Sequence, residues 1–132
     1  MRPRAAARRS ARPTCGRVLE VEVKASARFL RLSPRKARLV TDLIKGKSAE
    51  EAISILENLP KSTAVPLGRV VRSAIANAEN NFNLTLENLY VKNAIANEGP
   101  RMKRVWYRGR GRRDLKVHRM AHLEVVLDER GS

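Results

Sequence analysis

The sequence has 132 residues, of which 28 are lysine or arginine and 13 are aspartate or glutamate, so its formal net charge is +15. A chain of this length supports one hydrophobic core, and a hydrophobic content of 42% is too high for a wholly disordered chain. The single cysteine excludes an intrachain disulfide and a cysteine-based zinc site. No apolar run approaches the roughly 20 residues of a membrane helix, so a transmembrane protein is also excluded.

The first 17 residues carry six arginines and no acidic residue. Organellar transit peptides have a similar composition, but we interpret this segment as a basic N-terminal extension of a single domain that spans residues 18–132. Such concentrated positive charge is typical of a segment that binds a polyanion, because neutralising phosphates releases their counterions and favours binding. The candidate RNA-binding residues of the extension are Arg2, Arg4, Arg8, Arg9, Arg12 and Arg17.

Residues 18–25 alternate between apolar and charged side chains, with Val21, Val23 and Ala25 on one face. This period of two predicts a half-buried strand.

Three helices are predicted after this strand. Ser33 as N-cap and Pro34 at the first helical position predict the start of the first helix, and Gly46 predicts its end. Ser48 and Glu51 form a capping box that predicts the start of the second. Apolar residues at helical spacing predict a third helix, which starts at Ser62 or Thr63 and ends at Asn80 and Asn81, and whose alanines (Ala74, Ala76, Ala78) predict close packing against a sheet.

The pattern then changes back to a period of two. Leu89, Val91, Asn93 and Ile95 are predicted to share one strand face, and a matching run of Leu123, Val125 and Leu127 lies near the C-terminus. A turn centred near Arg110 would fold residues 98–122 into a hairpin arm roughly 40 Å long, at about 3.3 Å per residue. Together these elements predict an α+β fold, with three helices on a small antiparallel sheet and a long protruding β-hairpin.

The arm is the most informative feature, because residues 101–119 contain nine basic residues and one acid. An isolated, like-charged ribbon is marginal in water, so a surrounding polyanion is a better explanation than a solvated loop or a disordered arginine–glycine segment. Arginines match phosphates, and the aromatic residues offer stacking surfaces for unpaired RNA bases. The candidate RNA-binding residues of the arm are Arg101, Lys103, Arg104, Trp106, Tyr107, Arg108, Arg110, Gly111, Arg112, Arg113, Lys116, His118 and Arg119.

The body of the domain adds a second set of candidates around the first predicted helix. A capped helix N-terminus flanked by cations favours phosphate binding. These RNA-binding candidates of the body are Arg35, Lys36, Arg38, Lys45 and Lys47.

Catalytic and metal sites are not predicted, and no cofactor is expected. The acidic residues are scattered, and no pair of carboxylates meets a histidine in an arrangement suited to catalysis. His118 and His122 are four residues apart on a predicted strand, which separates them by roughly 13 Å and is too far for one shared metal ion.

Five sequence blocks occur in order along the chain: Ser33–Val40, Asp42–Lys47, Ser73–Asn81, Glu98–Pro100 and Lys103–Arg104. Together they resemble the bacterial-type L-twenty-two family of large-subunit ribosomal proteins. The resemblance implies an α+β domain that organises large-subunit ribosomal RNA, with a hairpin that reaches inward and lines the nascent-peptide tunnel. It also implies neighbouring ribosomal proteins and the nascent peptide as partners, a location in the ribosome of the cytoplasm or of an organelle, and neither a membrane partner nor a homo-oligomer.

The resemblance extends to the tip of the arm, with three departures. Tyr107 stands where the family usually has proline, Gly109 where it has alanine, and Arg113 where it has a small residue. The matching positions are Lys103, Arg104, Arg108, Arg110, Gly111, Arg112, Asp114 and Arg119.

Two other classes of protein remain as alternatives. A free-standing nucleic-acid chaperone or DNA-binding module would bind many duplexes with similar affinity and would not need a rigid arm. A cationic membrane-surface protein would need an amphipathic helix with a basic face, whereas the basic residues here lie mainly off the predicted helices.

Overall fold

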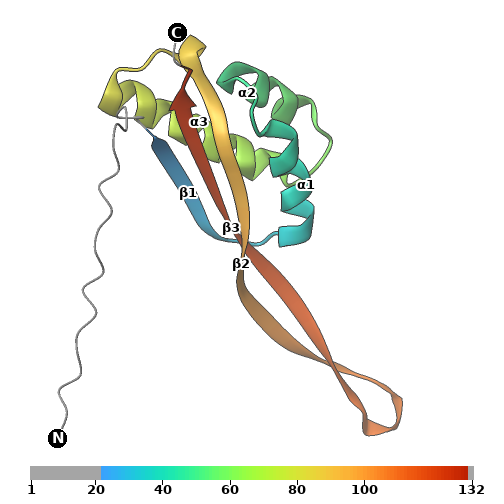
Figure 1. Cartoon of the computed structure of the whole chain (residues 1–132). Coiled ribbons are helices and arrows are strands. Elements are labelled where there is room, and N and C mark those ends of the chain that lie inside the picture. Colours follow the sequence, from blue (N-terminus) through green and yellow to red (C-terminus); the bar gives the residue numbers. More distant parts are fainter. Residues whose placement is uncertain (1–21, 131–132) are drawn as a thin grey trace, which may run out of the picture.

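The computed structural model describes residues 22–130 and confirms the expected α+β fold, with helices on one face of an antiparallel sheet (Figure 1). The three strands lie in the order β1-β3-β2. The predicted N-terminal extension lies outside the described residues. The strands are β1 (Val23–Leu30), β2 (Leu89–Tyr107) and β3 (Arg113–Glu129), and the helices are α1 (Pro34–Ile44), α2 (Ala49–Asn58) and α3 (Ala64–Phe82).

The hydrophobic core lies between the sheet and the helices. Leu123, Val125 and Leu127 on the central strand β3 are at most 1% exposed, which confirms the predicted alternation there. Helix α3 packs on β1 and β3, and α1 packs on β2. The alanines Ala74 and Ala78 of α3 are fully buried, and their small side chains allow the close approach to the sheet that their spacing predicts.

The structure differs from the sequence prediction in four features, namely the ends of β1 and α3 and the exposure of residues on the faces of α3 and β2. Strand β1 continues beyond Ala25 to Leu30, and α3 continues to Phe82, where Asn83 ends it in the left-handed conformation with φ 53°. Ala76 is exposed rather than packed on the sheet.

The fourth difference is the buried face of β2. The pairing of β2 with β3 shifts register between Val91 and Asn93, which reverses the inward face from that point. Ala94 and Ala96 are therefore buried, while Asn93 and Ile95 are only partly buried. The prediction that Asn93 and Ile95 share one strand face with Leu89 and Val91 is wrong for this reason.

Both predicted N-caps are at the expected positions, but they are not equivalent. The Ser48 hydroxyl accepts a hydrogen bond from the Glu51 backbone N–H at 3.3 Å, whereas the Ser33 side chain makes no capping hydrogen bond. The predicted stop at Gly46 is also confirmed, because Gly46 has φ 74° immediately after α1.

These two caps give a matched test of the local structure. We expect Ser48→Ala to lower the free energy of unfolding by about 1 kcal/mol, because a helix donor loses its acceptor. Ser33→Ala should change it much less, because no capping bond is lost. Urea unfolding followed by circular dichroism measures both; equal losses would contradict the cap assignment.

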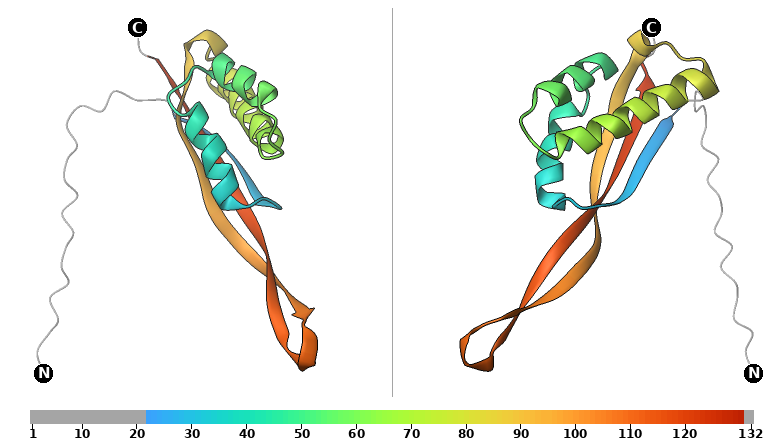
Figure 2. Two further views of the ribbon diagram at one scale, coloured as in Figure 1. Left: turned by 90° about the vertical axis from the view of Figure 1, so that its right-hand side faces the viewer. Right: turned by 180° about the vertical axis from the view of Figure 1, so that it is seen from behind.

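The hairpin arm is a direct extension of the sheet (Figures 1 and 2). Pairing of β1 with β3 ends at Leu30 and Ala121, and beyond this point β2 and β3 continue alone as a two-stranded, twisted ribbon. A register shift between Glu98 and Arg101 marks the root of the arm. Pro100, which has no N–H to donate, falls within this interruption.

Candidate nucleic-acid interface

The two-stranded part of the arm presents different side chains on its two faces. Val105 pairs with Leu115, and Trp106 pairs with Asp114, so neighbouring residues of β2 point to opposite sides of the ribbon. Trp106 and Tyr107, which are 52% and 77% exposed, therefore lie on opposite faces. The arm offers an aromatic surface on each side rather than one joint platform.

Trp106 is held by a neighbour across the ribbon. The ammonium group of Lys116 lies 4.9 Å from the centre of the Trp106 ring, which is a favourable cation–π distance. This contact leaves the ring half exposed and restricts its orientation. A partner base can therefore stack on a side chain that is already positioned.

The tip is a tight turn, as predicted. Arg110 and Gly111 adopt positive φ values of 58° and 68°, and the Arg108 N–H donates to the Arg112 carbonyl at 2.8 Å. The Arg108 guanidinium also donates to the Asp114 carboxylate at 2.6 Å. Gly109 is not in a left-handed conformation, and a Cβ there would meet no atom, so the glycine imposes no special geometry on the turn.

Most cations of the arm have no acidic partner within residues 22–130. Arg108, which pairs with Asp114, and Arg101 are exceptions; the Arg101 guanidinium donates to the Glu98 carboxylate at 2.8 Å. This hydrogen bond and the positive charge of Arg101 lower the pKa of the Glu98 carboxyl below its usual value. Cations that face each other across the ribbon, such as Arg104 and Lys116, repel one another and favour an anionic partner between them.

Some of the RNA-binding candidates of the body lie at the root of the arm. Ser33, Pro34, Arg35 and Arg38 of the α1 start line a cavity of about 480 Å³ together with Glu98 and Arg119 of the arm. The Arg38 side chain donates through Nε to the Ala96 carbonyl at 3.1 Å, which fixes its direction. The structure thus brings arginines from α1 and β3 to one surface.

The remaining body candidates do not join this cluster. Lys36 is exposed on α1, and Lys45 lies about 15 Å along the helix axis from Arg35 at 1.5 Å per residue. Lys45 forms an exposed ion pair with Asp42 at 3.1 Å, and Lys47 is exposed just beyond the end of α1. The body candidates therefore form two groups at opposite ends of one helix.

Arg28 and Phe29, which line a cavity on the sheet, are not among the binding residues predicted from the sequence. Both belong to the part of β1 beyond Ala25, where apolar and polar residues go on alternating as far as Phe29, so the predicted strand stopped too early. The signal that marks them is an exposed aromatic residue beside an arginine in a segment with no acidic residue.

The two histidines lie on β3, and each has its own surroundings. His118 pairs with Met102 in the arm, and His122 accepts a hydrogen bond at Nδ1 from the Phe29 backbone N–H. In the described part of the chain, no group of three or more His, Cys, Asp or Glu side chains is arranged to hold a metal ion. No helix within residues 22–130 has the length and apolar character needed to cross a membrane.

A comparison with known protein families gives a match that covers most of the chain. The family described as Ribosomal protein L22p/L17e matches residues 25–128. The chain belongs to this family. The L22p/L17e family is a family of ribosomal structural proteins, so the chain is not an enzyme.

Relatives of the L22p/L17e family cover most of the chain. The large ribosomal subunit protein uL22 of Thermotoga sp. (strain RQ2) is 54% identical over 111 residues, which cover 84% of this chain and 70% of the relative. The protein of the same name from Thermoanaerobacter sp. (strain X514) is 48% identical and covers 83% of this chain and 99% of the relative. That from Carboxydothermus hydrogenoformans is 49% identical, with 83% and 97% covered.

Proposed function

We propose that the chain binds and organises large-subunit ribosomal RNA, with the arm reaching inward to line the nascent-peptide exit tunnel. The observation that carries this proposal is the arm itself. A ribbon with no core of its own presents nine cations, one acid and two exposed aromatic residues. Membership of a ribosomal protein family supports RNA as the polyanion.

The arm, the arm root, the N-terminal extension and the helices have different roles. The tip and both faces of the arm bind RNA deep in the subunit, and Arg110 at the turn meets the nascent peptide. The arginines at the arm root hold phosphates near the body, and those of the N-terminal extension (residues 1–17) add contacts outside the domain of residues 18–132. The exposed helices remain for neighbouring ribosomal proteins, and the chain works as a single copy in the ribosome of the cytoplasm.

Sedimentation tests the ribosomal part of this proposal. Tagged protein from a cell lysate should remain with the large subunit on a sucrose gradient after a high-salt wash, because many phosphate contacts act together. Release to the top of the gradient would instead favour a loosely held nucleic-acid chaperone. A photoreactive residue in place of Arg110 should crosslink to a stalled nascent peptide, whereas the same residue in place of Arg69 on α3 should not.

Trp106 provides a direct test of RNA binding by the arm. It is the single tryptophan of the chain, so intrinsic tryptophan fluorescence reports on the arm alone. We expect unpaired RNA to quench this fluorescence, and Trp106→Leu to weaken RNA binding about five-fold, since one base stack contributes at least about 1 kcal/mol. Unchanged fluorescence at saturating RNA would contradict stacking on this face.

A further inference from the structure

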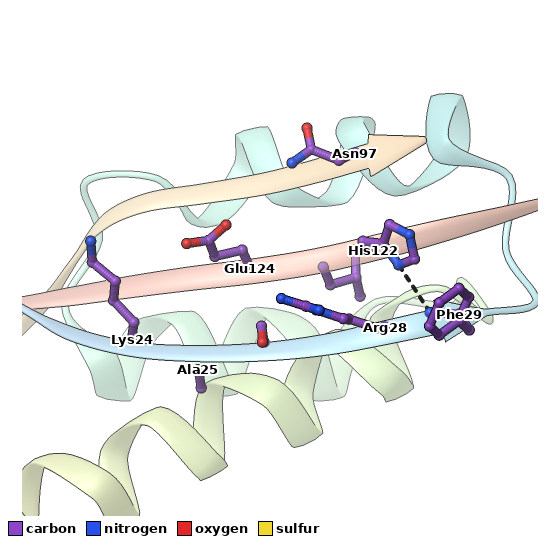
Figure 3. Close-up of a pocket in the computed structure, with 9 residues that line it drawn as sticks. Lys24, Ala25, Arg28, Phe29, Asn97, His122 and Glu124 are labelled. Atoms are coloured by element: carbon purple, nitrogen blue, oxygen red, sulfur yellow. Dashed lines mark hydrogen bonds between the residues drawn. The ribbon is translucent and has the colours of Figure 1, made fainter. Parts of the chain in front are cut away.

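A second surface with features of a binding site lies on the open face of the sheet, which faces away from the helices (Figure 3). It is a cavity of about 380 Å³ lined by residues of all three strands. Pairing places Asn97 of β2 opposite His122 of β3, and Arg28 of β1 follows Ala27, which pairs with Leu123. Arg28, His122 and Asn97 thus form a row across the sheet.

Phe29 borders this cavity in an unusual conformation. Its φ of 58° lies in the left-handed region, which bulky residues rarely adopt, and it lies within the irregularity between Ala27 and Leu30. The side chain is 62% exposed instead of packing in the core. The irregular backbone therefore presents an aromatic ring at the edge of the cavity.

His122 holds the ring of Phe29 in place. The Phe29 backbone N–H donates to His122 Nδ1 at 3.0 Å, and the two rings meet edge to face with their centres 4.9 Å apart (Figure 3). Because Nδ1 accepts this bond, the proton of the neutral imidazole is on Nε2. The aromatic platform is thus fixed before a ligand arrives.

The charges around the platform favour an anionic ligand. Arg28 has no ion-pair partner within the described residues, and Lys24 is paired only loosely with Glu22 at 3.4 Å. Among the described residues, Glu124 is the one acidic residue that lines the cavity, and Asn97 adds an amide that both donates and accepts hydrogen bonds. An aromatic face, a guanidinium and an amide are the groups that bind the base, phosphate and base edge of an unpaired nucleotide.

We propose that this cavity binds one unpaired RNA nucleotide, with its base stacked on Phe29, its phosphate on Arg28 and its base edge near Asn97. The inference rests on the proposed function, since the same RNA would supply the nucleotide, but it assigns a site separate from the two-stranded ribbon of the arm. The helices are not involved, because they cover the opposite face of the sheet.

The test uses the isotope-labelled full chain and the single-stranded RNA penta-adenylate as the probe. Ring signals of His122 report on the open face, and the indole signal of Trp106 reports on the arm. We expect both to shift on titration. Phe29→Leu should weaken the affinity reported by His122 about five-fold or more while leaving that reported by Trp106 unchanged.

The matched control is Phe82→Leu, which removes the other phenylalanine of the chain, 48% exposed at the end of α3. It should change neither affinity. Arg28→Gln should reduce the log–log salt slope reported by His122 by about 0.7, corresponding to one phosphate contact. A persistent hydrogen bond from the residue-29 amide to His122 shows that the Phe29→Leu chain keeps its local fold.

The outcomes separate this inference from the proposed function. Equal His122-reported affinity for the wild-type chain and Phe29→Leu overturns the inference, as does equal affinity for penta-adenylate and an abasic pentamer. If Trp106 responds and His122 does not, the open-face site is wrong while RNA binding by the arm stands. If His122 responds and Trp106 does not, the open-face site stands and the function proposed for the arm fails.

Discussion

Replacing residues 101–119 with a two-residue Asn-Gly turn should leave the body folded and remove most of the affinity for large-subunit ribosomal RNA. The body should fold because every buried core residue lies outside this segment. The affinity should fall because the segment carries nine of the 28 basic residues and one acid. Its net charge of +8 predicts that the log–log salt slope becomes less steep by about 6 to 7.

A milder pair of variants tests whether RNA binding depends on the position of the positive charge or only on its total amount. Arg110, Arg112 and Arg113 changed together to Gln should reduce the salt slope by about 2 to 3, because up to three phosphate contacts are lost. The control changes three exposed cations of the helical body to Gln and removes the same total charge. Filter binding over about 50 to 200 mM salt measures both slopes, and equal slopes would show that net charge alone determines binding. The control residues are Lys61, Arg69 and Arg72.

Leu127→Ala should produce the largest loss of stability. Leu127 is fully buried on the central strand β3, so its truncation removes apolar contacts and leaves a cavity. Such a change costs about 2 to 5 kcal/mol, a large part of the stability of a small domain. Urea unfolding followed by helical circular dichroism measures the loss in free energy.

The control for this variant is Leu39→Ala on the outer side of α1. Leu39 is 58% exposed, so the change should alter the free energy of unfolding by less than about 0.5 kcal/mol. A similar loss in both variants would contradict the placement of the core between β3 and the helices. Because the same strand continues into the arm, the Leu127→Ala chain is also expected to hold the arm root less firmly.

The elements that the sequence predicted best are those whose limits depend on local chemistry. Ser33 with Pro34 and the box of Ser48 with Glu51 specify helix starts through backbone geometry and a single hydrogen bond, so a short window suffices. The turn near Arg110 was predictable because two periodic runs flank a glycine-rich segment.

The features that the sequence did not predict depend on pairing between distant strands. The register shift near Asn93 reverses the inward face of β2. No residue near the shift indicates whether Asn93 or Ala94 faces the core. The left-handed Phe29 has the same origin, because the bulge forms only where β1 meets β3. For this reason the position of the hairpin arm was predictable, while the open-face cavity was not.

The ribbon of the arm also affects how the protein behaves when it is free of RNA. Between Ala121 and the tip of the arm, both strands are edge strands with unpaired backbone donors and acceptors. Such open edges allow separate chains to pair edge to edge and aggregate. Charged side chains oppose that association, and here cations lie along both strands from Arg101 to Arg119. The arginines that we propose to bind RNA therefore also oppose the association of separate copies through these edges.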